Sequence, residues 1–273
     1  MKKIHSYIII ILLCISVSGC KSTTTNSGNN VVIKVNGSTS MEKLINGLGE
    51  LINREYPNIS IEAQFTGSSA GIESVINKTS LIGNSSRLLK EEEEAKGLVA
   101  NIVAIDGIIV ITNQSNNVSS LSKEQLIAIY KGEIRNWNEI GGEDVPIVII
   151  GREAASGTRT AFEDILGIEN ECKYIQEINE AGGVVAKVES IKGAIGYVSL
   201  DLLTKKTKAL AIDGIEPTIE SIRNGQYLLQ RPYLMVTMGE ISKQSQEVQK
   251  IFEFIDSDKG KAFIESIGLV PVS

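Results

Sequence analysis

Residues 147–162, IVIIGREAASGTRTAF, combine an apolar strand, a polar turn and the start of a helix. Apolar residues recur at helical spacing from Phe162 onward. The Ser-Gly-Thr at 156–158 therefore stands at a predicted helix N-terminus, where free N–H groups and the helix dipole favour an anion. Its glycine lets a ligand approach the backbone, and Arg152 supplies a planar set of donors. The segment predicts a site for a small oxyanion.

Two other interpretations of this segment are open. Ser156 can be a helix cap and nothing more, with Arg152 at the surface. A nucleotide P-loop would require Gly-Lys-Ser/Thr where the chain has Ser156-Gly157-Thr158, so the missing lysine disfavours a nucleotide.

The strand–turn–helix pattern occurs twice more. A β-branched strand at 31–35 precedes Asn-Gly-Ser-Thr-Ser at 36–40, and a strand at 59–65 precedes Thr-Gly-Ser-Ser-Ala-Gly at 66–71. Apolar residues at helical spacing follow both turns. In open α/β sheets such turns lie at the carboxyl edge of the strands, where ligands bind. We therefore expect the three turns to converge on one ion.

A fourth polar segment, Ile-Gly-Asn-Ser-Ser-Arg at 82–87, adds hydroxyls and a second arginine, Arg87. Serine-rich turns with no base to activate a nucleophile favour binding over catalysis. The chain is predicted to be a binding protein and not an enzyme, with no catalytic residue, no cofactor and no metal site.

The N-terminus has the features of an export signal. Lys2 and Lys3 precede an apolar run over 7–17 that is too short to span a bilayer. Val-Ser-Gly-Cys at 17–20 resembles the bacterial lipoprotein box, in which the cysteine is lipidated and becomes the first mature residue. We expect a signal peptide at 1–19 and a lipid anchor on Cys20.

Cleavage after residue 19 would change the available chemistry. It removes His5, the only histidine, and Cys14, so a histidine general base and His-ligated zinc are excluded from the mature chain. With Cys20 acylated, Cys172 has no partner and no disulfide is expected. Two lysines are also lost, which leaves 25 basic against 33 acidic residues, a net charge of −8. This charge disfavours nucleic acid as a partner.

The segment 20–30 contains Ser, Thr, Asn and Gly after its first two residues and is predicted to be a flexible tether. Ten such residues reach roughly 15–20 Å. About 240 residues remain from Val31 onward, enough for one large domain or two modest ones.

These motifs together resemble the phosphate-binding proteins of bacterial phosphate ABC importers. The resemblance covers nearly the whole chain from Val31. It rests on the following segments: 36–40, 67–71, 82–87, LIAIYKGEIRNW at 126–137, 152–159, GAIGYVS at 193–199 and GLVPV at 268–272.

The resemblance implies a type II periplasmic-binding-protein fold, in which two α/β lobes are joined by two crossing strands that act as a hinge. Lobe I would take 31–105 plus 233–273, and lobe II would take 106–232. Apolar segments at 102–111 and 234–236 suit the crossing strands.

The resemblance also implies a set of phosphate-binding residues. On the family's contact positions this sequence has Thr39, Ser40, Ser68, Ser86, Arg152, Ser156, Gly157 and Thr158. Ser38, Arg87 and Asp106 are further candidates.

One position departs from the family pattern. Many members have an aspartate where this chain has Ser86, and that carboxylate accepts the proton of hydrogen phosphate while it repels sulfate. Asp106 is the candidate substitute. It can equally be an acid that caps the crossing strand or pairs with Arg87.

The expected function is that of an extracytoplasmic receptor, lipid-anchored at the cell membrane, which binds inorganic phosphate as a monomer and delivers it to an ABC permease. A receptor for sulfate or another tetrahedral oxyanion is an alternative in the same class. A phosphate-ester hydrolase or a surface sensor is an alternative in another. Hydrolysis would call for a metal cluster or an activated nucleophile, which the serine-rich turns do not supply.

Three further features are predicted to be structural. Ser122 and Gln125 form a capping box, Trp137 belongs to a core, and the acidic run 91–94 is a solvated helix face.

Overall fold

The computed structural model describes residues 30–272, so the predictions for the signal peptide, Cys20 and the tether as far as residue 29 lie outside it. The strands are β1 (Val31–Gly37), β2 (Ile59–Gln64), β3 (Ile82–Ser85), β4 (Leu98–Asn113), β5 (Ser120–Leu121), β6 (Val148–Arg152), β7 (Gln176–Ile178), β8 (Ala194–Ser199), β9 (Thr207–Ala209), β10 (Ala211–Ile212), β11 (Gln230–Met238) and β12 (Val270–Pro271).

The α-helices are α1 (Glu42–Glu55), α2 (Ser68–Ile76), α3 (Glu91–Glu94), α4 (Lys123–Tyr130), α5 (Gly157–Leu166), α6 (Ala181–Ser190), α7 (Ile219–Arg223), α8 (Gln246–Asp256) and α9 (Asp258–Ser266). Short 3₁₀ helices are η1 (Thr39–Met41), η2 (Trp137–Ile140), η3 (Leu200–Leu202) and η4 (Ile241–Lys243).

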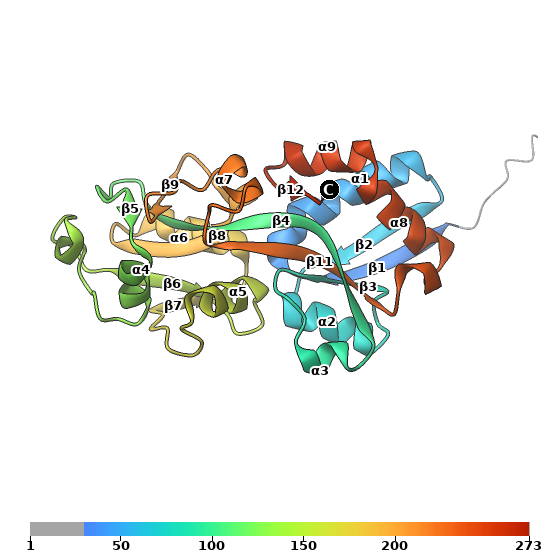
Figure 1. The fold of residues 1–273 in the computed structure, drawn as a ribbon, viewed down its shortest axis with the longest axis horizontal. Coiled ribbons are helices and arrows are strands. Elements are labelled where there is room, and N and C mark those ends of the chain that lie inside the picture. Colours follow the sequence, from blue (N-terminus) through green and yellow to red (C-terminus); the bar gives the residue numbers. More distant parts are fainter. Residues whose placement is uncertain (1–29, 273) are drawn as a thin grey trace, which may run out of the picture.

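The main sheet has the strand order β2-β1-β3-β11-β4-β8-β6-β7, and β9 and β12 add to β4. Its two ends are parallel: β1 pairs in parallel with β2 and β3, and β6 with β7 and β8. In the middle, β4 and β11 run antiparallel to each other and to their outer neighbours. Two parallel α/β units are thus joined through one antiparallel pair, which Figure 1 shows running between the two halves of the molecule.

A hydrophobic core lies on each side of this pair. One packs α1, α8 and α9 against β1 and β3, and the other packs α4, α5 and α6 against β6 and β8. The two-lobed α/β fold with two crossing strands is confirmed. The predicted lobe limits, at 105/106 and 232/233, fall inside β4 and β11.

The predicted strand–turn–helix units are present. α1 buries Leu44, Ile45, Leu48 and Ile52 at helical spacing after β1. α2 follows β2, and α5 follows β6. Each helix therefore begins beside the carboxyl end of a strand, as the turns predicted.

The structural predictions hold with one exception. The capping box of Ser122 and Gln125 is formed, and Trp137 is 2% exposed with its indole N–H donated to Gly193 O at 3.0 Å. The prediction that the acidic run 91–94 is a solvated helix face was wrong at Glu93. Its side chain is 12% exposed because it pairs with Arg87.

Candidate functional site

Three helix N-termini supply hydroxyls to the space between the lobes. Ser38 caps η1 after β1, and Ser68 is the first residue of α2 after β2. Ser156 caps α5 after β6 by accepting the Arg159 N–H at 3.3 Å. The three serines are at most 3% exposed. Their burial at helix N-termini, where the dipole is positive, suits an anion.

Ser86, just beyond the end of β3, brings two of these hydroxyls together. Ser38 Oγ donates to Ser86 Oγ at 2.8 Å, and Ser68 Oγ lies 3.2 Å from Ser86 Oγ. The Ser86 N–H donates to Ser68 Oγ at 3.0 Å. We call Ser38, Ser68 and Ser86 the serine cluster. All of it belongs to the predicted lobe I.

Residues of the predicted lobe II touch the opposite side. Thr158 Oγ1 lies 2.8 Å from Ser40 Oγ, and Arg152 Nη2 donates to Thr39 Oγ1 at 2.8 Å. A Cβ on Gly157 would lie 2.2 Å from the nearest oxygen of the serine cluster, so only glycine fits there. The structure thus brings the eight principal predicted positions together. That they hold a ligand stays a prediction.

Arg152 is the charged group of this site. Its Nε donates to Ile178 O at 3.0 Å, and Nη2 donates to Asn179 O at 2.8 Å as well as to Thr39. These acceptors are all neutral, and within residues 30–272 no carboxylate forms an ion pair with Arg152, which is 2% exposed. Burial lowers the pKa of Arg152 to about 10, and the nearby Arg231 adds to the lowering. The guanidinium is therefore charged at neutral pH and uncompensated.

Arg87, a further candidate, is engaged elsewhere. Its Nη1 and Nη2 donate to the two carboxylate oxygens of Glu93, each at 2.8 Å. Nη2 also lies 3.4 Å from Ser69 Oγ. The carboxylate of Glu93 compensates the charge of Arg87 beside the site.

Asp106, on β4, is also fully engaged. Its carboxylate accepts from Ser199 Oγ at 2.6 Å, from Leu200 N at 3.3 Å, and from Arg231 Nε and Nη2 at 3.1 and 2.9 Å. The alternative in which Asp106 pairs with Arg87 was wrong, because each has a different partner. The acceptor role of Asp106 toward a ligand stays a prediction, although these contacts favour an ion-paired acid.

Sequence reasoning missed the contribution of β11. Arg231 Nη1 donates to Ser86 O at 3.1 Å, and the Tyr233 hydroxyl lies 3.0 Å from Ser40 O and 2.8 Å from Ser199 Oγ. The crossing strand thus fixes main-chain atoms of two predicted ligand residues. The available signal was an arginine, Arg231, directly before Pro232 in a mostly apolar strand.

The arrangement offers neutral donors and one cation. Hydroxyls, helix N–H groups and a guanidinium are the groups that hold an oxyanion in a water-poor site. Within the described residues, no group of three or more His, Cys, Asp or Glu could hold a metal ion. The same part of the chain contains no helix long and apolar enough to cross a membrane.

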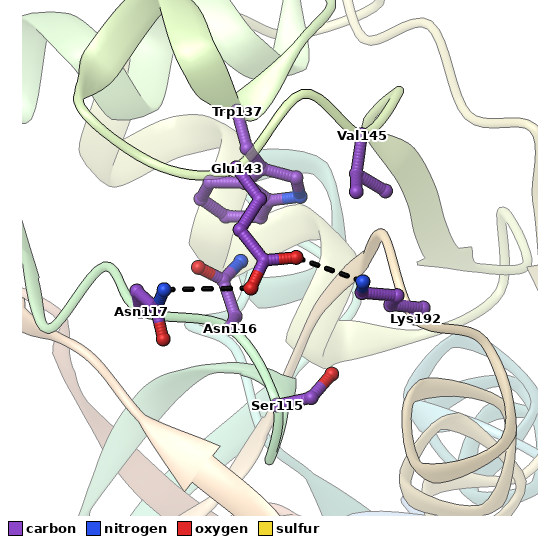
Figure 2. A pocket seen from close by; sticks show the side chains of 7 residues that line it. All are labelled: Ser115, Asn116, Asn117, Trp137, Glu143, Val145 and Lys192. Atoms are coloured by element: carbon purple, nitrogen blue, oxygen red, sulfur yellow. Dashed lines mark hydrogen bonds and ion pairs between the residues drawn. The ribbon is translucent and has the colours of Figure 1, made fainter.

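A separate pocket lies away from this site, beside η2. Figure 2 shows Glu143 between Asn117 and Lys192, with the Lys192 ammonium 2.8 Å from its carboxylate. The cavity measures about 10 Å³, room for about one water molecule. Its size and the carboxylate at its centre make it unsuitable for an oxyanion.

Comparison with known proteins agrees with the fold. The family model of the PBP superfamily domain matches residues 22–266. The phosphate-binding protein PstS of Bacillus subtilis is 32% identical over 88% of this chain and 81% of its own. The chain belongs to the phosphate-binding proteins of the PBP superfamily.

Other members of this family match over almost their full length. PstS of Borreliella burgdorferi is 28% identical over 100% of this chain and 99% of its own. A Clostridium perfringens substrate-binding protein solved with bound phosphate superposes with a TM-score of 0.84 at 34% identity, covering 89% of this chain and 100% of that one. An ABC-type phosphate transport receptor from Vibrio cholerae gives a TM-score of 0.75 at 30% identity, over 88% of this chain and 100% of its own.

Proposed function

We propose that the protein is a receptor that binds inorganic phosphate between its two lobes and delivers it to an ABC permease. The proposed ligand residues are those that meet between the lobes: Thr39, Ser40, Ser68, Ser86, Arg152, Ser156, Gly157 and Thr158. The proposal also takes 31–105 with 233–273 as lobe I and 106–232 as lobe II. It assigns the protein no catalytic role.

One observation carries this proposal. Arg152 is a buried cation with no carboxylate partner in the described part of the chain, and it stands among hydroxyls and helix N-termini. An isolated buried charge is costly unless an opposite charge compensates it. A tetrahedral oxyanion supplies that charge and enough oxygens for the surrounding donors. The relatives named for phosphate identify which oxyanion to test first.

Calorimetry on phosphate-stripped protein tests the proposal directly. Phosphate, sulfate and molybdate are titrated separately under the same conditions. We expect the tightest binding for phosphate, at one site per chain. A protein that binds none of the three oxyanions would refute the proposal.

A sulfate receptor is the second candidate, and the composition of the site favours keeping it. The hydroxyl contacts of the serine cluster and of Ser40 with Thr158 are all to other hydroxyls or to a main-chain N–H, with no carboxylate among these partners. Sulfate has no proton to donate, so a site of neutral donors does not repel it as a carboxylate would. Tighter binding of sulfate than of phosphate in the same titrations would establish this alternative.

We infer further that Cys20 anchors the receptor to the outer face of the cell membrane and that the receptor is a monomer. Several acyl chains are needed for stable attachment, and the lipoprotein box supplies the site for them. The full-length protein should sediment with membranes, whereas Cys20→Ser should be released. Equal recovery of both proteins in the membrane fraction would contradict the anchor.

A further inference from the structure

A closed network of hydrogen bonds holds the main chain of Arg152. Tyr197 Oη accepts the Arg152 N–H at 3.3 Å, and Arg159 Nη1 donates to Arg152 O at 3.0 Å. Glu163 accepts from Arg159 Nε at 2.8 Å and from Tyr174 Oη at 2.9 Å. The two phenol oxygens lie 3.1 Å apart, which closes the network. We call Arg159, Glu163, Tyr174 and Tyr197 the Arg152 brace.

The direction of the hydrogen bonds in the brace is fixed by its one carboxylate. Glu163 can only accept when ionised, so the Tyr174 hydroxyl donates to it. The Tyr197 hydroxyl must then donate to Tyr174, which leaves a Tyr197 lone pair for the Arg152 N–H. Both main-chain polar groups of Arg152, its N–H and its C=O, are thereby engaged.

Glu163 and Tyr197 of the brace are buried, and Arg159 and Tyr174 are half-buried. Tyr197 is 1% exposed and stacks on Phe162, with ring centroids 4.2 Å apart and planes within 14°. Burial raises the pKa of both phenols, so they keep their protons. Gly151, next to Arg152, allows the Tyr174 ring to lie against the strand, because a Cβ there would meet the ring at 2.2 Å.

We propose that the Arg152 brace is a positioning device for anion capture, which sets the place of the Arg152 guanidinium by fixing its main chain. This inference rests on the proposed function. Among residues 30–272, the brace side chains form no hydrogen bond with the serine cluster and reach the site through the Arg152 main chain, while the Arg159 main-chain N–H also donates to Ser156 Oγ at 3.3 Å. Placement matters because a bidentate guanidinium must match the oxygens of its anion in direction as well as distance.

Tyr197→Phe is the primary variant, since it keeps the stacked ring and removes only the hydroxyl. We expect phosphate to bind about two- to tenfold more weakly, the usual effect of one hydrogen bond. Glu163→Gln is the second variant. It keeps the shape of the side chain, removes the charge that orients the network, and should shift affinity in the same direction.

Tyr227→Phe is the matched control. Tyr227 is a fully buried phenol of the same lobe, and its hydroxyl donates to Ile108 O at 3.0 Å, outside the brace. Its removal should lower the thermal midpoint of the phosphate-free protein by a similar amount as Tyr197→Phe. It should leave phosphate affinity within twofold of wild type.

A double-mutant cycle separates positioning from general stability. In an Arg152→Lys background the flexible lysine depends less on where its main chain lies, so adding Tyr197→Phe should change affinity by less than twofold. The same loss in both backgrounds would overturn the proposal, as would wild-type affinity in both Tyr197→Phe and Glu163→Gln. Absence of phosphate binding by the wild-type protein would overturn the proposed function and the brace together.

Discussion

Arg152 and Arg231 are two buried arginines beside the serine-rich turns, in opposite electrostatic situations. The side chain of Arg231 is 1% exposed, and its charge is compensated by Asp106, whose side chain is 0% exposed. Arg152 is 2% exposed and donates to neutral oxygens. Both arginines also reach residues of the serine-rich turns, Arg231 through Ser86 O and Arg152 through Thr39 Oγ1.

The contrast distinguishes a structural cation from a binding cation. A buried ion pair is complete within the protein, so breaking it costs stability. A buried charge without a partner carries an unfavourable desolvation free energy until a ligand supplies the opposite charge. Removing Asp106, the partner of Arg231, should therefore damage folding, and removing Arg152 should damage binding.

The largest expected effect is on stability. Asp106→Asn leaves the Arg231 charge buried and unpaired, and we expect the free energy of unfolding to fall by about 3–5 kcal/mol. Urea denaturation of the phosphate-free protein measures this value. Arg152→Ala serves as the comparison, because it removes an uncompensated charge and should cost markedly less. Equal losses in the two variants would remove the distinction between the arginines.

Phosphate affinity should depend on Arg152 most strongly. Truncating a desolvated, hydrogen-bonded charge costs roughly 2–5 kcal/mol, so Arg152→Ala should bind phosphate about 30-fold more weakly or worse. Arg87→Gln is the matched variant, because Glu93 already compensates Arg87, and it should stay within threefold of wild type. An Arg152→Ala protein within threefold of wild type would exclude Arg152 from the site.

Selectivity is expected to depend on position 86. Ser86→Asp places a carboxylate in the serine cluster, where it accepts the proton of hydrogen phosphate and repels sulfate. The phosphate-to-sulfate affinity ratio should rise by a factor that corresponds to about 1–3 kcal/mol. Calorimetry with both anions measures the ratio. If the phosphate-to-sulfate affinity ratio falls in a folded Asp106→Asn protein, Asp106 is the group that accepts the proton of hydrogen phosphate.

The smallest effect concerns Asp201 and pH. Both of its carboxylate oxygens are buried and have no hydrogen-bond partner within residues 30–272, and its main-chain oxygen accepts from Lys43 of lobe I at 3.3 Å. Burial raises the pKa of Asp201 to about 6, and Asp106 adds to this rise, while the nearby Ser199 hydroxyl, Lys43 and Arg231 oppose it. Because its main-chain oxygen contacts lobe I, we expect that closing the lobes covers this acid and favours its neutral form.

Closure should therefore take up a proton. The contribution of neutral Asp201 to closure is fully present below about pH 4, and it is lost as the pH rises through about 6. Asp201→Asn is neutral throughout, so it should bind phosphate more tightly than wild type above pH 6 and equally well below pH 4. The ratio of the two dissociation constants at each pH cancels the ionisation of phosphate itself. A ratio independent of pH would show that Asp201 is not covered on closure.

Local sequence patterns predicted the strand–turn–helix units because their causes are local. The apolar face of α1 and the cap at Ser156 are both set by neighbours within a few residues. Because such turns lie at the carboxyl edge of the strands in open α/β sheets, the three turns were predicted to lie together without knowledge of the whole topology. These steps gave the positions that meet between the lobes.

Long-range pairings could not be predicted in the same way. Asp106 and Arg231 are 125 residues apart, and Asp106 had several arginines as possible partners. The Arg152 brace combines a recognisable local pair, Arg159 and Glu163 at i,i+4, with two tyrosines that only the fold brings near. Charge pairing depends on which groups burial brings together, and sequence spacing does not record that.

The close approach of Gly157 to the serine cluster has a consequence for organic phosphates. A single added methyl group at position 157 would meet a serine oxygen at 2.2 Å, so the gap between the lobes tolerates no extra carbon there. The alkyl group of a phosphate ester, if it pointed along this contact, would wedge the lobes apart as an alanine side chain would. Shape alone, independently of charge, would then separate the free ion from its esters.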